Sequence, residues 1–231
     1  MDPDVAARLR AEMVEHQLRG RGIRDEAVLA AMAAVPRDLF VPPDVLAYAY
    51  SDDALPIEAG QTISQPYMVA QMTELLEPRP EMRVLEVGTG SGYQAAVLAT
   101  IGCRVVTIER HAELAAAAEA RLAQLGLGDL VRIEVGDGSL GLPQEVPFEG
   151  IVVTAAAPAV PATLRAQLAE GGRLVVPVGS RDFQELLAVV RHGDDFEERR
   201  CGSCVFVPLV GAGGFDADAP RWRPWLGRLH P

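Results

Sequence analysis

Three glycines stand between a short apolar segment and a helical one, at a junction where a strand followed by a helix could hold a ligand. The sequence from Arg83 to Tyr93 reads RVLEVGTGSGY and contains Gly88, Gly90 and Gly92. Glycines at such a junction permit a tight turn and let the backbone approach a ligand closely. The dinucleotide fingerprint GxGxxG would need glycine at position 93, where tyrosine stands, so the pattern disfavours a dehydrogenase that binds a dinucleotide.

Acidic residues stand at the predicted ends of three successive strands. Glu86 places a carboxylate beside the glycine turn, which suits a cationic ligand and opposes a phosphate. Glu109 follows Gly88 by about 20 residues, the offset at which an acidic side chain accepts from both ribose hydroxyls. Asp137 could accept from an adenine amine, and Gly138 beside it leaves room for the ring. Together these signals describe an adenosine that carries a positive charge, and we predict that the cofactor is S-adenosylmethionine.

The segment from Gly60 to Ala70, GQTISQPYMVA, is a polar loop directly ahead of an apolar run. One interpretation is a helix entrance, in which Ser64 caps free backbone amides and Pro66 lies in the first turn. The other interpretation is that the loop forms part of a functional site. The segment alone leaves both interpretations open.

Short β-branched segments alternate with Ala- and Leu-rich helical ones after a helical N-terminal region. The predicted strands are Val84–Val87, Arg104–Glu109, Val131–Val135, Ile151–Thr154 and Arg173–Val178. Strands that alternate with helices imply right-handed crossovers, and therefore a doubly wound, mainly parallel Rossmann-like α/β sheet. Two further runs, Glu185–Arg191 and Cys204–Val210, are joined by the charged segment 194–200 and predict an antiparallel pair at one end of this sheet.

The second of these runs contains VFVPL, from Val205 to Leu209, with a proline inside it. This pattern is typical of an edge strand, and such an edge could pair with an extended peptide through main-chain hydrogen bonds. An alternative is that Val205, Phe206 and Leu209 only pack in the core of the sheet, and both interpretations could hold together.

We expect a single domain over residues 1–231. It would comprise a helical cap with the polar loop (1–80), an α/β core that binds the cofactor (81–210) and a C-terminal extension (211–231). The extension is rich in Gly, Pro and Arg, and two interpretations are open for it. It is either a tail with only local order, or a segment that Trp222 and Trp225 pin to the body.

The composition excludes several classes of protein. With 21 Lys and Arg against 32 Asp and Glu, the net charge of −11 repels nucleic acids. No apolar run approaches the roughly 20 residues that span a bilayer, and the N-terminus MDPDVAARLR lacks the apolar core of a secretory signal. We therefore expect a cytoplasmic protein with no nucleic-acid or membrane partner. Cys201 and Cys204 form a single CxxC, which we interpret as ordinary thiols rather than as a metal or redox site.

The whole pattern resembles the protein-L-isoaspartate O-methyltransferase family, in particular its bacterial members. The resemblance extends roughly from Leu18 to Leu209. It rests on the segments RGIRDEAVL, VPRDLFV, LPIEAGQTISQPYMVAQMTELL, VLEVGTGSGYQAAVLA, VGDG, AAAP, GGRLVVPVG and VFVPL. It implies an enzyme that transfers a methyl group from S-adenosylmethionine to the α-carboxylate of L-isoaspartyl residues in damaged proteins, which initiates their repair. Isoaspartyl peptides and proteins would be the substrates, and we expect a monomer without a metal.

The resemblance also implies roles for particular residues. Ser64, in the tripeptide TIS, would be the catalytic residue and would touch the substrate. The residues expected to bind the cofactor are Thr62, Ile63, Glu86, Gly88, Thr89, Gly90, Glu109, Asp137 and Gly138. The residues expected to border the peptide groove are Val205, Phe206, Val207, Pro208 and Leu209. The chain departs from the family pattern at Phe148 and Glu149, and again at Val210, Gly211 and Ala212, where some members use polar residues to touch the cofactor.

The implied reaction agrees with the absence of an obvious general base. A carboxylate has a reference pKa near 4, so the nucleophile is already ionised at neutral pH. His16, His111, His192 and His230 are scattered along the chain. We expect the Ser64 hydroxyl to donate to the substrate carboxylate or to line the path of methyl transfer. Two other functions stay open: a methyltransferase for another carboxylate or hydroxyl, and a catalytically silent protein that retains the cofactor pocket.

Overall fold

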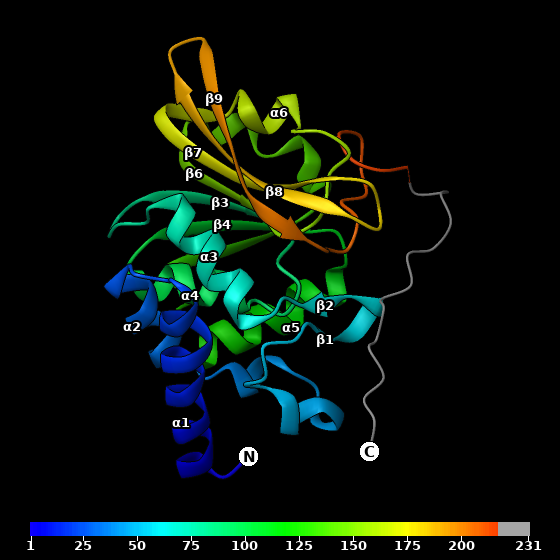
Figure 1. Cartoon of the computed structure of the whole chain (residues 1–231). Coiled ribbons are helices and arrows are strands. Elements are labelled where there is room, and N and C mark those ends of the chain that lie inside the picture. The colour runs from blue at the N-terminus through cyan, green and yellow to red at the C-terminus, as the bar shows by residue number, and fades with distance from the viewer. Residues whose placement is uncertain (217–231) are drawn as a thin grey trace.

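Seven strands form one sheet in the order β5-β4-β3-β6-β7-β8-β9, and β1 and β2 form a separate pair (Figure 1). The computed structural model describes residues 1–216. The strands are β1 (Leu55–Pro56), β2 (Thr62–Ile63), β3 (Arg83–Val87), β4 (Arg104–Glu109), β5 (Val131–Val135), β6 (Phe148–Val153), β7 (Leu168–Gly179), β8 (Gln184–His192) and β9 (Asp195–Cys204). The strands from β5 to β7 run parallel, whereas β8 and β9 are antiparallel to their neighbours. The prediction of a doubly wound sheet with an antiparallel pair at one end is confirmed.

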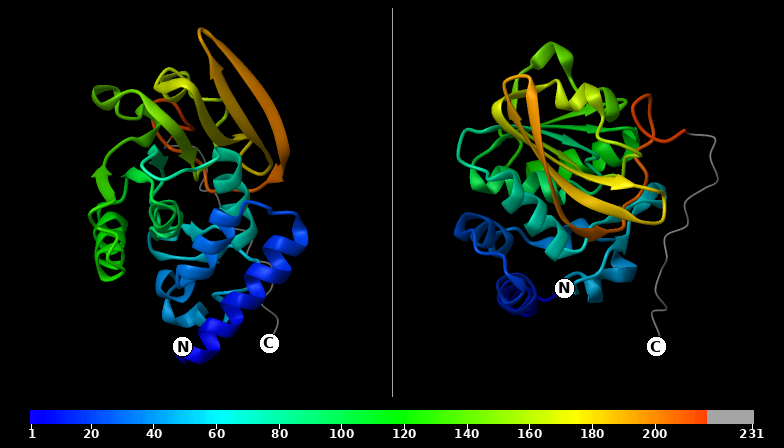
Figure 2. Two further views of the ribbon diagram at one scale, coloured as in Figure 1. Left: turned by 90° about the vertical axis from the view of Figure 1, so that its left-hand side faces the viewer. Right: turned by 45° about the horizontal axis from the view of Figure 1, so that its top comes forward.

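Helices cover the sheet and form the N-terminal cap (Figure 2). The α-helices are α1 (Pro3–Glu12), α2 (Glu26–Ala34), α3 (Pro66–Leu76), α4 (Tyr93–Ile101), α5 (Ala112–Gln124) and α6 (Ala162–Arg165). The shorter elements are a π-helix, Met13–Leu18, and the 3-10 turns Arg19–Arg21, Arg37–Phe40, Pro43–Tyr48, Glu58–Gly60, Gly138–Leu140 and Pro143–Glu145. Asp2 and Asp25 cap α1 and α2 by accepting from free amides of the first turn.

The two faces of the sheet bury separate apolar clusters because side chains alternate along each strand. On β3, Val84 belongs to the cluster that α3, α4 and the N-terminal helices cover, whereas Leu85 and Val87 belong to the other cluster. On β6, Val152 faces the first side, and its neighbours face the second. Alternation therefore turns Glu86 toward the face covered by α3 and α4.

The order of the strands reverses at β3, because the chain passes from β3 to β4 on one side and returns to β6 on the other. In open α/β sheets, ligands bind outside the carboxyl ends of the strands at this point. The glycine turn lies there, between β3 and α4. Gly88 has φ +97°, and a Cβ on it would approach Thr154 Oγ1 to 2.5 Å, so the turn requires glycine at this position.

One predicted strand is placed wrongly. The run Cys204–Val210 is not a strand, and β9 is formed instead by the charged segment that had been assigned to the link. Gly193, with φ +63°, lies in a two-residue turn that brings β9 back along β8, and Arg200 pairs with Glu185 across the two strands at 3.1 Å. Charged side chains suit a strand at the edge of a sheet, where they discourage pairing with other chains.

The segment VFVPL is consequently not an edge strand of the sheet, and its pairing with a peptide stays a prediction. Ala156 N–H donates to the Val207 carbonyl at 2.8 Å, and Leu209 N–H donates to the Ala156 carbonyl at 2.7 Å. The backbone of this segment therefore holds the loop after β6. Trp222 and Trp225 lie outside the described residues, so both interpretations of the extension stay predictions.

Candidate cofactor and substrate site

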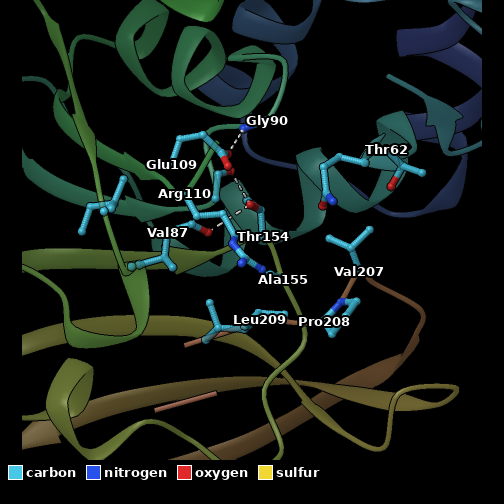
Figure 3. Close-up of a pocket in the computed structure, with 16 residues that line it drawn as sticks. Thr62, Val87, Gly90, Glu109, Arg110, Thr154, Ala155, Val207, Pro208 and Leu209 are labelled. Atoms are coloured by element: carbon cyan, nitrogen blue, oxygen red, sulfur yellow. Dashed lines mark hydrogen bonds between the residues drawn. The ribbon is translucent and has the colours of Figure 1, made fainter. Parts of the chain in front are cut away.

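Three adjoining hollows lie at the carboxyl end of the sheet, and Thr62 lines all of them. The first, which we call the strand-end cavity, lies between the ends of β3, β4 and β6 and the segment 207–210 (Figure 3). Glu109 lines it with 5% of its surface exposed. Its carboxylate accepts from Gly90 N–H at 2.9 Å and from His111 N–H at 3.0 Å. Glu109 thus connects the glycine turn to the end of β4 by a hydrogen bond.

The second hollow, the inner cavity, has a volume of about 40 Å³ and lies behind the glycine turn. Glu86 lines it and is fully buried, and neither of its carboxylate oxygens has a hydrogen-bond partner among the described residues. Burial raises the pKa of Glu86 to about 8, with the charge of Glu109 acting in the same direction and the Thr107 hydroxyl opposing. An unpaired buried carboxyl group is the complement of a cationic ligand.

The third hollow, the loop groove, runs between the polar loop, the start of α3 and the segment 201–206. Ser64 is half-buried and lines both the loop groove and the inner cavity. The groove also contains Val205, which is 59% exposed, and Arg21, whose guanidinium lies 3.6 Å from the ring centroid of Tyr67. The hydroxyl of Ser64 therefore stands where two hollows of different character meet.

The interpretation of Ser64 as a helix cap is wrong. The N-cap residue of α3 is Gln65, which makes no side-chain capping bond, and Pro66 occupies the first turn as predicted. Asp52 performs the capping, because its Oδ1 accepts from Tyr67 N–H at 2.9 Å. Its other oxygen accepts from the side-chain nitrogen of Gln65 at 3.2 Å. Ser64 is thus not needed to start the helix.

Asp137 lies beside the strand-end cavity rather than in it, and lines a neighbouring hollow with Arg110. Its Oδ1 accepts from the Ser139 amide and hydroxyl at 3.0 and 2.6 Å, and Oδ2 accepts from Ala212 N–H at 2.8 Å. Partial burial alone would raise the pKa of Asp137, but these bonds lower it. A Cβ on Gly211 would come within 2.0 Å of Oδ1. At positions 210–212, where some family members have polar side chains, this chain instead contacts Asp137 through the main-chain N–H of Ala212.

The remaining predicted residues fall into different hollows. Gly88, Gly90 and Gly138 line the strand-end cavity, and Ile63 and Thr89 line the inner cavity. Val205 and Phe206 line the loop groove, whereas Val207, Pro208 and Leu209 line the strand-end cavity. The five residues expected in one peptide groove are thus divided between two sites.

Several lining residues had not been predicted from the sequence: Arg21, Tyr67, Gln94, Arg110, Thr154 and Ala155. Thr154 follows β6, and its hydroxyl lies 2.5 Å from the Gly88 carbonyl, to which it donates. The position of Thr154 at the end of the strand beside β3 is a signal that could have identified it. Gln94 lies two residues after the last glycine of the turn and offered no such signal.

The cysteines and histidines within residues 1–216 form no metal-binding cluster. Burial raises the pKa of Cys204 to about 12, so its thiol stays protonated at neutral pH. Cys201 borders the loop groove, and no group of three or more potential metal ligands occurs among residues 1–216. His16 and His192 are exposed, and His230 lies outside the described residues. None of the helices described is both long and apolar enough to cross a membrane.

A glycine turn at the reversal point of a doubly wound sheet, with an acid at the end of the next strand, defines an α/β protein that binds a nucleoside cofactor. Residues 9–214 match the family model described as protein-L-isoaspartate(D-aspartate) O-methyltransferase. The chain belongs to this family.

Individual relatives agree with the family assignment. A protein-L-isoaspartate O-methyltransferase of Methylorubrum populi is 58% identical over 209 residues, which cover 89% of this chain and 98% of the relative. The protein of the same name from Methanoregula boonei is 55% identical over 207 residues, covering 90% and 95%. A Plasmodium falciparum structure, described as a putative member in complex with S-adenosyl-L-homocysteine, is 26% identical with a TM-score of 0.75, covering 87% of this chain and 98% of the other.

Proposed function

We propose that the protein is a protein-L-isoaspartate O-methyltransferase, which methylates the α-carboxylate of L-isoaspartyl residues in damaged proteins. The observation that carries the proposal is the position of Ser64, on the wall shared by the inner cavity and the loop groove. A cofactor in the first two hollows and a peptide in the loop groove would meet at this residue. When bound, S-adenosylmethionine supplies a methyl group on a positively charged sulfur.

The residues of the cavities suit this cofactor. Glu109, at the end of β4, would accept from ribose hydroxyls, and Glu86, whose buried carboxyl group has no hydrogen-bond partner among residues 1–216, would contact the ammonium of the amino-acid part. We assign cofactor contacts to Thr62, Ile63, Glu86, Gly88, Thr89, Gly90, Glu109 and Gly138. We retain the proposal that Asp137 contacts the adenine, and the contact would be made from the hollow that Asp137 and Arg110 line together.

The chemistry requires orientation rather than proton transfer. The substrate carboxylate is ionised at neutral pH, so no base is needed to generate the nucleophile. The Ser64 hydroxyl would donate to one carboxylate oxygen and hold the other in line with the methyl group. Exclusion of water favours the step, because opposite charges neutralise each other as the methyl group moves. Without the protein, the backbone nitrogen of the next residue then attacks the ester carbonyl and methanol leaves, which gives a succinimide, and hydrolysis of the succinimide returns some normal aspartyl bonds.

The loop groove is proposed to hold the substrate peptide. Val205 and Phe206 supply apolar contacts, and the Arg21–Tyr67 pair forms part of the opposite wall. The proposed roles of Val207, Pro208 and Leu209 are confined to the junction with the cofactor, since they line the strand-end cavity. We also propose a cytoplasmic monomer made of one domain, whose net charge of −11 disfavours nucleic-acid partners.

Replacement of Glu109 by alanine is expected to raise the dissociation constant for S-adenosylhomocysteine by roughly 10- to 100-fold. The variant loses the acceptor proposed for the ribose, and it also leaves the Gly90 and His111 amides without their partner. Titration calorimetry measures the effect. Glu113→Ala, which removes an exposed acid four residues further along, is the matched control and should bind normally. Unchanged affinity in Glu109→Ala would refute the ribose role.

The repair reaction itself tests the proposed function. An isoaspartyl peptide incubated with the protein and S-adenosylmethionine should be converted in part to the aspartyl peptide, which chromatography separates from the starting material. Conversion should require the cofactor. A small carboxylate or hydroxyl compound methylated in preference to the peptide would favour a methyltransferase of another substrate class. Cofactor binding without any transfer would favour a silent binding protein.

A further inference from the structure

Gln94 is held in a single orientation at the inner cavity. It lies in the first turn of α4, is 6% exposed, and its side-chain nitrogen donates to the Thr73 hydroxyl oxygen at 2.8 Å. Thr73, on α3, is fully buried and donates its own proton to the Val69 carbonyl at 2.7 Å. Because a hydroxyl group has one proton, Thr73 can only accept from Gln94. The amide nitrogen must therefore face Thr73, and the amide oxygen is left over.

The free amide oxygen of Gln94 is one of three unpaired acceptors in this cavity. It has no hydrogen-bond partner among the described residues, and neither do the two oxygens of Glu86. Both side chains line the inner cavity, with Glu86 turned toward the face of the sheet that α3 and α4 cover. Each unpaired buried acceptor costs about 1–3 kcal/mol, so the site favours a ligand that brings donors.

The chemistry of the acceptors selects one kind of ligand group. A primary ammonium has three N–H donors and a positive charge, and it fits a cavity of about 40 Å³ that offers one carboxyl group and one neutral amide oxygen. A carboxylate in the same place would meet only acceptors from these two side chains once Glu86 is ionised. The Thr73 contact also prevents the amide from turning its nitrogen inward.

We propose that Gln94 binds the ammonium group of the cofactor's amino-acid part together with Glu86, and that Thr73 is the positioning residue that presents the Gln94 oxygen. This inference rests on the proposed function, because it takes S-adenosylmethionine as the cofactor. Gln94 thereby contributes to selection of a cofactor with an intact amino acid over one that ends at the thioether.

The test compares two ligands by titration calorimetry: S-adenosylhomocysteine, and 5′-methylthioadenosine, which retains the nucleoside and thioether but lacks the amino acid. Gln94→Leu is expected to raise the dissociation constant for S-adenosylhomocysteine by roughly 10- to 100-fold and that for 5′-methylthioadenosine less than about twofold. Gln94→Met is a second variant that keeps a flexible side chain of similar length. Equal losses for both ligands, or no loss for either, would overturn the role of Gln94.

Variants at Thr73 test the orientation. Thr73→Val removes the acceptor and should lose part of the preference for S-adenosylhomocysteine, whereas Thr73→Ser retains the hydroxyl and should keep it. A merely structural role would lower the affinity for both ligands alike, which would refute the positioning role. Wild-type protein that binds neither ligand would overturn the proposed function itself, so the two failures are distinguishable.

Discussion

Replacement of Ser64 by alanine is expected to lower kcat for an isoaspartyl peptide by about 10- to 100-fold, because small errors in the alignment of reacting groups cost rates of this order. The dissociation constant for S-adenosylhomocysteine should change less than about twofold, because the half-buried hydroxyl of Ser64 contributes little to a ligand that other residues hold. Ser64 caps no helix in the structure, so its loss should leave α3 intact. Steady-state kinetics and titration calorimetry separate the two effects.

The matched control is Ser180→Ala, which removes a serine from the exposed turn between β7 and β8. This variant should retain wild-type turnover. Ser64→Ala with wild-type kcat would show that the catalytic assignment is wrong. A loss of cofactor affinity as large as the loss of turnover would instead place Ser64 among the cofactor-binding residues.

Replacement of Glu86 by glutamine should have the largest effect on cofactor binding, about 100-fold in the dissociation constant for S-adenosylhomocysteine. Removing one member of a buried charge pair typically costs 2–5 kcal/mol, and each 1.4 kcal/mol is about tenfold in affinity. Neither carboxylate oxygen makes a hydrogen bond within residues 1–216, so the variant removes no hydrogen bond of the described fold. Calorimetry at neutral pH measures the change, and unchanged affinity would refute the contact with the ammonium group.

The same variant should alter the pH dependence of stability. Burial raises the pKa of Glu86 to about 8 from an ordinary value of 4.5, so the folded protein keeps a proton that the unfolded chain releases between these values. The free energy of unfolding of the protein without cofactor should therefore fall as the pH rises from about 4.5 to 8. Glu86→Gln should flatten this dependence in urea titrations. If the free energy of unfolding depended on pH in the same way for both proteins, the raised pKa of Glu86 would be contradicted.

The core of the fold and the cofactor end of the site could be predicted because their signals are local. The β-branched runs of β3 and β4 are largely buried, and the glycines and Glu109 stand where these strands end. Ser64 was identified by resemblance, because its own segment fitted a helix cap equally well. The structure removes that ambiguity through Asp52, which lies 15 residues from the amide that it caps.

The features that could not be predicted depend on contacts distant in sequence. The charged residues of β9 form a strand because β8 offers a partner and a tight turn, which outweighs their polar character. Position 211 requires glycine because a Cβ there would clash with the Asp137 carboxylate. This carboxylate accepts from Ala212 N–H, which lies 75 residues away in the sequence. Gln94 lines the inner cavity and donates to Thr73, which lies 21 residues earlier in the sequence. The helical pattern around Gln94 predicts neither contact.

The most direct test of the central claim uses labelled S-adenosylmethionine and two peptides that differ only at one residue, aspartyl in one and isoaspartyl in the other. The amount of base-labile methyl ester formed on each peptide is measured. We predict label on the isoaspartyl peptide alone, because the loop groove and the proposed cofactor site meet at Ser64, where the α-carboxylate of the isoaspartyl residue would lie. Label on both peptides, or on neither, would contradict it.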